Sequence, residues 1–112
     1  MAALRAIREE EKNMVRAMLQ HIGADEAQYP ISSQVSEYGD PHMGSINFDN
    51  DRPDLYDGDL VQCEYSDEDG ENVVLSLTKD AEGKLLDLDF WKSNFTPLVK
   101  YPTPEVVSYK QK

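Results

Sequence analysis

The stretch that most constrains the fold is Lys84–Lys92, because its side chains alternate between apolar and polar types. From residue 86 the order is Leu, Asp, Leu, Asp, Phe, Trp, which is the two-residue period of a β-strand with one buried face. The side chains expected to point into a core are Leu86, Leu88 and Phe90. Those expected to share the opposite, exposed face are Asp87, Asp89 and Trp91.

Four other segments carry strand-like patterns, and short turns join them into antiparallel neighbours. The segments are residues 31–38, 43–48, 60–66 and 72–78. The turn Asp67–Gly70 ends in the Asp-Gly pair typical of hairpins, and Asp80–Gly83 makes the next turn. We therefore expect a hairpin over 31–48 and a three-stranded meander over 60–91, which together form an antiparallel sheet of four or five strands within residues 31–92.

Residues 3–22 have the spacing of an amphipathic helix, with apolar side chains at three- and four-residue steps and Gly23 just after the last of them. One helix packed on one antiparallel sheet is an α+β fold, and 112 residues suit a single domain over residues 1–112. The tail, residues 93–112, contains three prolines within 97–104, which exclude a central strand. We expect Phe95, Leu98 and Tyr101 to anchor the tail and residues 106–112 to fray.

The net charge of −11 is concentrated in the middle of the chain. Residues 23–91 hold eighteen acidic and three basic side chains, whereas both flanking parts carry a small positive excess. Like charges repel, so direct binding to nucleic acid or to an anionic membrane is disfavoured, and a basic protein partner is favoured. The alternative is that the acidic surface only keeps the protein soluble.

Few residues offer catalytic or metal chemistry. The two histidines, His21 and His42, have no motif around them, and Cys63 alternates with core positions as a buried, inert thiol does. The acidic loop 49–59 departs from a calcium loop, because proline, aspartate and leucine stand at its fifth, sixth and twelfth positions. We expect no catalytic residue, metal or cofactor, and with one cysteine, no apolar leader and no long apolar run we expect a cytoplasmic protein.

A binding role fits the exposed strand face better than catalysis. Asp87 and Asp89 have the spacing of paired catalytic carboxylates, but a flat strand face lacks the cleft that would separate their pKa values. An exposed indole beside carboxylates suits a surface rich in Arg or Lys. The residues expected to bind a partner are Asp57, Asp59, Glu64, Asp67, Glu68, Asp87, Asp89 and Trp91. The alternative is that Trp91 packs under the tail, in contact with Phe95 and Tyr101.

Several segments together resemble a family of small, uncharacterised bacterial proteins. The likeness covers about residues 8–102 and is most specific at 84–102. The segments that carry it are Glu10–Lys12, Met43–Phe48, the Asp-Gly hairpin, Leu86–Lys92, Phe95–Leu98 and Tyr101-Pro102. That resemblance implies no enzymatic activity. In size and charge the chain is also similar to immunity proteins of bacterial toxin systems, such as contact-dependent growth inhibition.

These features give three hypotheses of different classes. The first is a non-enzymatic immunity protein that binds and neutralises a basic toxin domain, such as a nuclease, and is itself a monomer. The second is a structural or regulatory binding module that joins copies of itself through a strand edge. The third, and the weakest, is an enzyme that uses Asp87, Asp89 and His42.

Overall fold

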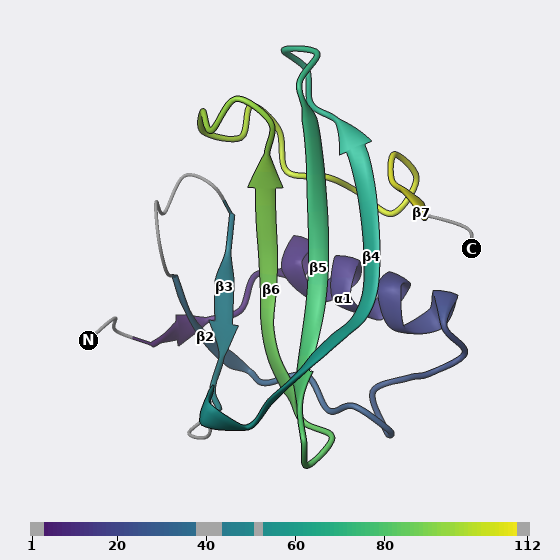
Figure 1. Ribbon diagram of the computed structural model, residues 1–112, viewed down its shortest axis with the longest axis vertical. Helices are drawn as coiled ribbons and strands as arrows, with labels where there is room; N and C mark the ends of the chain where they lie inside the picture. Colours follow the sequence, from purple (N-terminus) through teal and green to yellow (C-terminus); the bar gives the residue numbers. More distant parts are fainter. Residues whose placement is uncertain (1–3, 38–43, 51–52, 110–112) are drawn as a thin grey trace.

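The computed structural model describes residues 4–37, 44–50 and 53–109. Within them, a seven-stranded antiparallel sheet has the order β1-β2-β3-β6-β5-β4-β7, and Figure 1 shows the helix α1 crossing behind the central strands. The elements are β1 (Arg5–Ala6), α1 (Glu9–His21), β2 (Gln34–Glu37), β3 (Ile46–Phe48), a 3-10 turn (Pro53–Leu55), β4 (Tyr56–Ser66), β5 (Asn72–Asp80), β6 (Leu85–Lys92) and β7 (Ser108–Tyr109). The α+β prediction is confirmed.

The predicted hairpin and meander are both present. Strand β2 pairs with β3, and β4, β5 and β6 pair in chain order. Strand β3 joins the two units by pairing with β6, placing Asn47 opposite Asp87. The acidic segment expected to be a loop over 49–59 is shorter, because β4 already begins at Tyr56. The turn expected at Gly39–His42 lies outside the described residues.

Two short strands at the sheet edges were not expected. Ser108 and Tyr109, predicted to fray, pair with Glu64 and Cys63 of β4. The ring of Tyr109 stacks on His21 at the end of α1, with 3.8 Å between ring centroids. Because this contact and the β4 pairing hold both sides of the segment, fraying at 108–109 is a wrong prediction.

The helix begins later than residue 3. Arg5 and Ala6 pair with Val35 and Gln34 as strand β1, so the chain turns into α1 only at Glu9. The carboxylate of Glu11, 1% exposed, accepts hydrogen bonds from the Arg5 guanidinium at 3.0 and 2.8 Å and from the backbone N–H of Arg8 at 2.8 Å. The bond to Arg8 is the one that the third helical residue makes in a capping box, and the bonds to Arg5 join β1 to α1.

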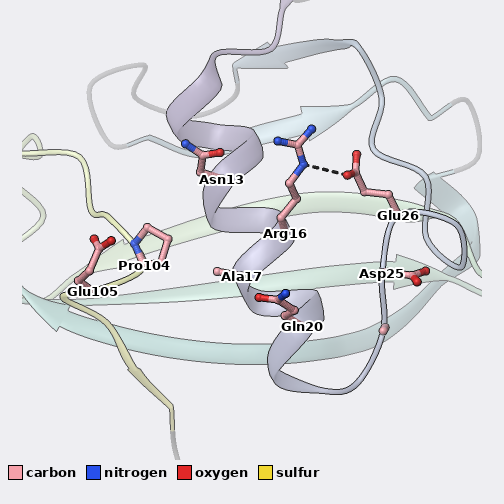
Figure 2. A pocket seen from close by; sticks show the side chains of 9 residues that line it. Asn13, Arg16, Ala17, Gln20, Asp25, Glu26, Pro104 and Glu105 are labelled. Atoms are coloured by element: carbon pink, nitrogen blue, oxygen red, sulfur yellow. Dashed lines mark hydrogen bonds and ion pairs between the residues drawn. The ribbon is translucent and has the colours of Figure 1, made fainter.

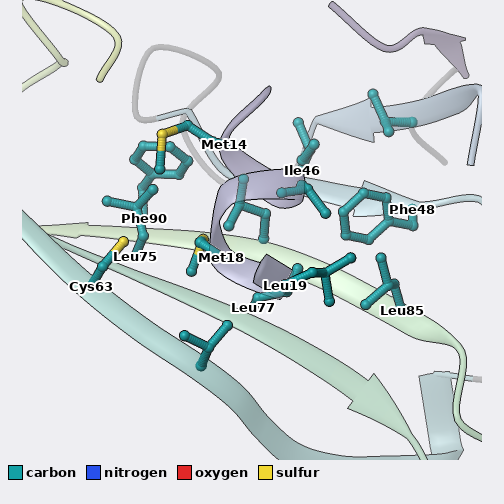
Figure 3. Packing of buried hydrophobic residues seen from close by; sticks show 14 of the residues in the cluster. Met14, Met18, Leu19, Ile46, Phe48, Cys63, Leu75, Leu77, Leu85 and Phe90 are labelled. Atoms are coloured by element: carbon teal, nitrogen blue, oxygen red, sulfur yellow. The ribbon is translucent and has the colours of Figure 1, made fainter. Parts of the chain in front are cut away.

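The core lies between α1 and the sheet. Met14, Met18 and Leu19 on α1 are fully buried, and Figure 3 shows them packed over inward-facing residues of the strands. Those strand residues are the predicted ones: Ile46, Phe48, Val61, Cys63, Tyr65, Val73, Leu75, Leu77, Leu88 and Phe90. Side chains of this size each contribute roughly 1.5–3 kcal/mol through burial, so this face holds the fold together.

One inward position in β6 differs from the prediction. A register shift lies between Leu77 and Lys79 in the β5–β6 ladder, where Leu77 faces Leu88 but Lys79 faces Leu85. Three steps along β6 therefore match two along β5, which is a β-bulge. As a result Leu85 belongs to the core cluster, whereas Leu86 is buried outside it, beside Tyr56 and Asp87.

The tail crosses the helix side of the sheet. Leu98 and Tyr101 pack against the core cluster as predicted, and Tyr101 lies 5.4 Å from Phe90 between ring centroids. Phe95 is instead 68% exposed and has a positive φ of 58°. The opposite face of the sheet, called here the outer face, carries no helix among the described residues.

Candidate functional site

The outer face brings together side chains from β4, β5 and β6 in rows across the ladder. One row runs Gln62, Ser76, Asp89, and the next runs Glu64, Val74, Trp91. Alternation places these residues on the same face because their neighbours Cys63, Leu75 and Phe90 are buried in the core. The strand register thus aligns Asp89 and Trp91 with Glu64 and Gln62 from a segment more than twenty residues earlier.

Asp59 is held by a small polar network at one end of this face. Its carboxylate accepts hydrogen bonds from the Tyr56 hydroxyl at 3.2 Å and the Gln62 amide at 3.0 Å. The negative charge of Asp59 is the main cause that raises the pKa of Tyr56, and the charges of Asp87 and Asp89 add to it. All three carboxylates therefore contribute negative charge that acts on the exposed Tyr56 phenol.

Asp87 lies deeper than its neighbours. It is half-buried, and its carboxylate accepts a hydrogen bond of 2.6 Å from the Thr78 hydroxyl. Burial raises the pKa of Asp87, the hydrogen bond from Thr78 opposes that shift, and the charges of Asp89 and Asp59 add to it. Asp89 is exposed and accepts a hydrogen bond of 3.1 Å from Ser45. A cation placed here would stabilise the charged form of Asp87. It would offset both the cost of burying that charge and the repulsion from Asp89 and Asp59.

Trp91 is 49% exposed, so the tail covers it only in part. Phe95 meets its indole edge-on, with 5.6 Å between ring centroids. Tyr101, expected to join this contact if the tail covered Trp91, lies instead against Phe90 on the core side. The indole is therefore available beside the carboxylates, with an exposed aromatic neighbour.

The remaining residues predicted to bind a partner lie in three different places. Glu64 is half-buried on the outer face. Asp57 forms an ion pair of 2.6 Å with Lys79. Glu68 is exposed at the β4–β5 turn. The Asp67 side chain is fully buried and bound to Lys92, so a partner cannot reach it unless the tail opens.

A cavity of about 390 Å³ opens beside Asp87, on a face that the sequence pattern led us to expect to be flat. Its walls include Leu4, Asn47, Asp49, Tyr56, Leu86 and Asp87. Sequence reasoning missed Tyr56, Leu86 and Leu4, because the bulge and strand β1 bring them here and neither follows from the alternation. No described histidine, cysteine or lysine lines this cavity, and its ionisable side chains are Asp49, Asp87 and Tyr56.

A larger cavity, about 560 Å³, lies between α1 and residues 104–105 (Figure 2). Its lining mixes polar side chains with Ala17, Ala24 and Pro104, and it includes the ion pair of Arg16 with Glu26 at 2.8 Å. Cys63 lies in the core, where burial raises the pKa of its thiol to about 12.

Among the residues described, no three His, Cys, Asp or Glu side chains gather as metal ligands would. Likewise no helix of the described ranges has the length and apolar character to cross a membrane.

The comparisons with known proteins identify the family. The family model described as "Domain of unknown function (DUF6984)" matches residues 4–102, so the chain belongs to this family. The match covers the helix, the strands β1 to β6 and the tail as far as Pro102. No curated protein and no solved structure matches this chain.

Proposed function

We propose that this chain is a non-enzymatic protein-binding module whose outer face docks a basic protein. The observation that carries the proposal is the half-exposed Trp91 on the same open face as Asp59, Glu64, Asp87 and Asp89. An aromatic anchor surrounded by acidic groups is the composition expected of a surface that receives Arg and Lys side chains.

The charge distribution supports a basic partner. The net charge of −11 attracts cationic proteins from a distance and speeds their encounter, by an effect that salt weakens. The half-buried Asp87 adds a local reason, because a positive group beside it offsets the cost of its burial.

For the class of partner we propose a basic toxin domain, such as a nuclease, which this chain neutralises as an immunity protein. The support is the general likeness in size and acidity to immunity proteins, together with an open face broad enough to cover an active site. An interface of standard size buries about 800 Å² on each partner, and the neighbouring strands β4, β5 and β6 would each contribute their outer face to it.

Self-association through a strand edge, the alternative hypothesis, has less support. The two edge strands, β1 and β7, have two residues each. Strand β4, which β7 covers only at Cys63 and Glu64, has two register shifts between Tyr56 and Val61. Short edges and bulges are the devices that prevent edge-to-edge pairing, so we propose a monomer.

The test uses two variants with equal loss of charge. In the first, Asp59, Asp87 and Asp89 become Asn and Glu64 becomes Gln. In the second, Glu9, Glu10, Glu82 and Glu105, which lie outside the outer face, become Gln. A basic protein captured from the native organism is purified, and its Kd for each variant is measured by calorimetry at low and high salt.

We expect the first variant to bind at least about tenfold more weakly than the wild type, while the second changes Kd by less than about threefold. A toxin partner should also stop growth when expressed alone and not when co-expressed with this chain. Equal weakening by both variants would mean that only the net charge governs binding, and it would contradict the proposal. Failure to capture any basic protein would contradict it too.

A further inference from the structure

We infer that the cavity beside Asp87 receives an arginine side chain of the basic protein that docks on the outer face. The inference rests on the proposed function and names the group that this part of the face recognises. The cavity is lined, among others, by Leu4, Asn47, Asp49, Tyr56, Leu86 and Asp87.

The apolar walls fit the methylene stem of arginine. Leu4 is 47% exposed and Tyr56 is 56% exposed, so both offer apolar surface to a side chain that enters the cavity. Leu86 adds a third apolar wall, because the bulge in β6 takes it out of the core. Bulges re-aim side chains at functional sites, and here one supplies an apolar wall for the cavity.

The polar walls fit the guanidinium head. Two carboxylates, Asp49 and Asp87, line the cavity, and Asn47 adds an amide that makes no side-chain hydrogen bond with the described part of the chain. Oδ1 of Asp87 accepts the Thr78 hydroxyl at 2.6 Å, and a carboxylate can accept further donors at its second oxygen. These groups are acceptors, and arginine presents five donors in a planar fork.

The negative charge around the cavity also favours a cation. No described lysine or arginine lines the cavity. The charges of Asp59, Asp87 and Asp89 all act on the Tyr56 phenol at its edge. Arginine suits this position better than lysine, because its flat guanidinium stacks on an aromatic ring such as that of Tyr56 while it pairs with a carboxylate.

The position relative to Trp91 fits a single protein partner. Leu86 and Trp91 are five residues apart on β6, which spans about 16 Å along the strand. An arginine in the cavity and an apolar or cationic group on Trp91 therefore fall within one interface of ordinary size.

The probe for this site is N-acetyl-arginine amide, titrated into the isotope-labelled protein and followed by backbone amide NMR shifts. A ligand of this size should bind with Kd on the order of 1 mM. We expect shifts centred on Asn47, Leu86 and Asp87. The neutral isostere N-acetyl-citrulline amide should bind at least about tenfold more weakly, and N-acetyl-lysine amide should fall between the two.

Two variants localise the effect. Asp87→Asn keeps an acceptor for Thr78 but removes the charge, and it should weaken arginine amide binding by about tenfold. Glu82→Gln, an exposed acid on the β5–β6 turn, should leave the Kd unchanged. Equal binding of arginine and citrulline amides, shifts away from the cavity, or an effect of Glu82→Gln as large as that of Asp87→Asn would overturn the inference.

This outcome is separable from that of the proposed function. If the neutralised outer face loses the basic partner but arginine amide does not shift the cavity residues, the inference is wrong and the proposed function stands. If arginine amide binds at Asp87 but the partner binds all variants equally, the pocket is real and the proposed docking face is wrong.

Discussion

The ε-ammonium of Lys92 lies 3.0 Å from the carboxylate of Asp67, and neither side chain is exposed. Lys92 also donates to Asp69 at 2.7 Å and to the backbone carbonyl of Pro97 at 2.9 Å. Asp67 in turn accepts the backbone N–H groups of Val99 and Lys100 at 2.8 and 3.1 Å. One buried ion pair thus ties the end of β6 to the β4–β5 turn and to the tail.

Removal of the Asp67 charge should destabilise the protein strongly. Asp67→Asn leaves the Lys92 ammonium buried with a weaker partner, and losing one member of a buried pair costs about 3 kcal/mol. The measurement is urea unfolding at neutral pH. The matched control is Glu68→Gln, an exposed neighbour that should change the free energy of unfolding by less than about 0.5 kcal/mol. A loss below about 1 kcal/mol for Asp67→Asn would contradict this role of the pair.

The same pair predicts a pH dependence. Burial raises the pKa of Asp67, but hydrogen bonds from Val99, Lys92, Glu68 and Lys100 outweigh it and hold the pKa below its ordinary value. A carboxyl group with a lowered folded-state pKa stabilises the fold above its unfolded pKa of about 3.9, and that stability is lost as pH falls through the folded value.

The free energy difference between wild type and Asp67→Asn should therefore be full at pH 6 and shrink as the pH falls below about 4. Urea unfolding of both proteins over that range measures it, and the comparison removes the contribution of the other carboxyl groups. A difference that stayed constant down to pH 2.5 would mean that Asp67 does not stabilise the fold through its charge.

The bulge in β6 predicts unequal costs for two adjacent leucines. Leu85 belongs to the core cluster, so Leu85→Ala should cost about 2–5 kcal/mol, as Leu88→Ala should. Leu86 is 7% exposed but lines the outer cavity, so Leu86→Ala leaves a less enclosed void and should cost less than Leu85→Ala, about 2 kcal/mol. Thermal or urea unfolding measures all three. Were Leu86→Ala the costlier change, the strict alternation would hold and the bulge would be wrong.

The contact of Phe95 with Trp91 predicts a change in indole accessibility without a large change in stability. Phe95→Ala removes an edge-on aromatic contact worth about 1 kcal/mol and exposes more of the indole. Because Trp91 is the only tryptophan, acrylamide quenching of its fluorescence reports the change directly. Quenching should increase in Phe95→Ala. The control is Val99→Ala, which changes another exposed residue of the tail and should leave quenching as in the wild type.

Much of the fold follows from local patterns. The alternation in 60–66, 72–78 and 85–91 and the Asp-Gly turn specify the meander, because each strand has one apolar face and short turns allow only antiparallel pairing. The helix was predicted too long because Leu4 and Ile7 are apolar at helical spacing, yet Arg5 and Ala6 find backbone partners in β2. Helix propensity and spacing are local properties, so they contain no information about a partner strand that is remote in sequence.

The candidate site was only partly predictable for the same reason. Alternation correctly placed Asp87, Asp89 and Trp91 on the face opposite the core, and the ladder register adds Glu64. Asp67 and Glu68 are adjacent acidic residues at the same turn. Asp67 is nevertheless buried, because Lys92 and the tail cover it. Only three-dimensional contacts separate these two carboxylates.

The sequence alone therefore determined which face of each strand is apolar, which strands are neighbours in the meander, and the acidic character of the open face. These depend on side chains a few residues apart, whose periodicity is independent of the rest of the chain. The tertiary structure decided where the ladder slips, so that Leu86 leaves the core and a cavity forms beside Asp87. It also decided that Lys92 is buried, because only packing of the tail against the β4–β5 turn brings two carboxylates to its ammonium.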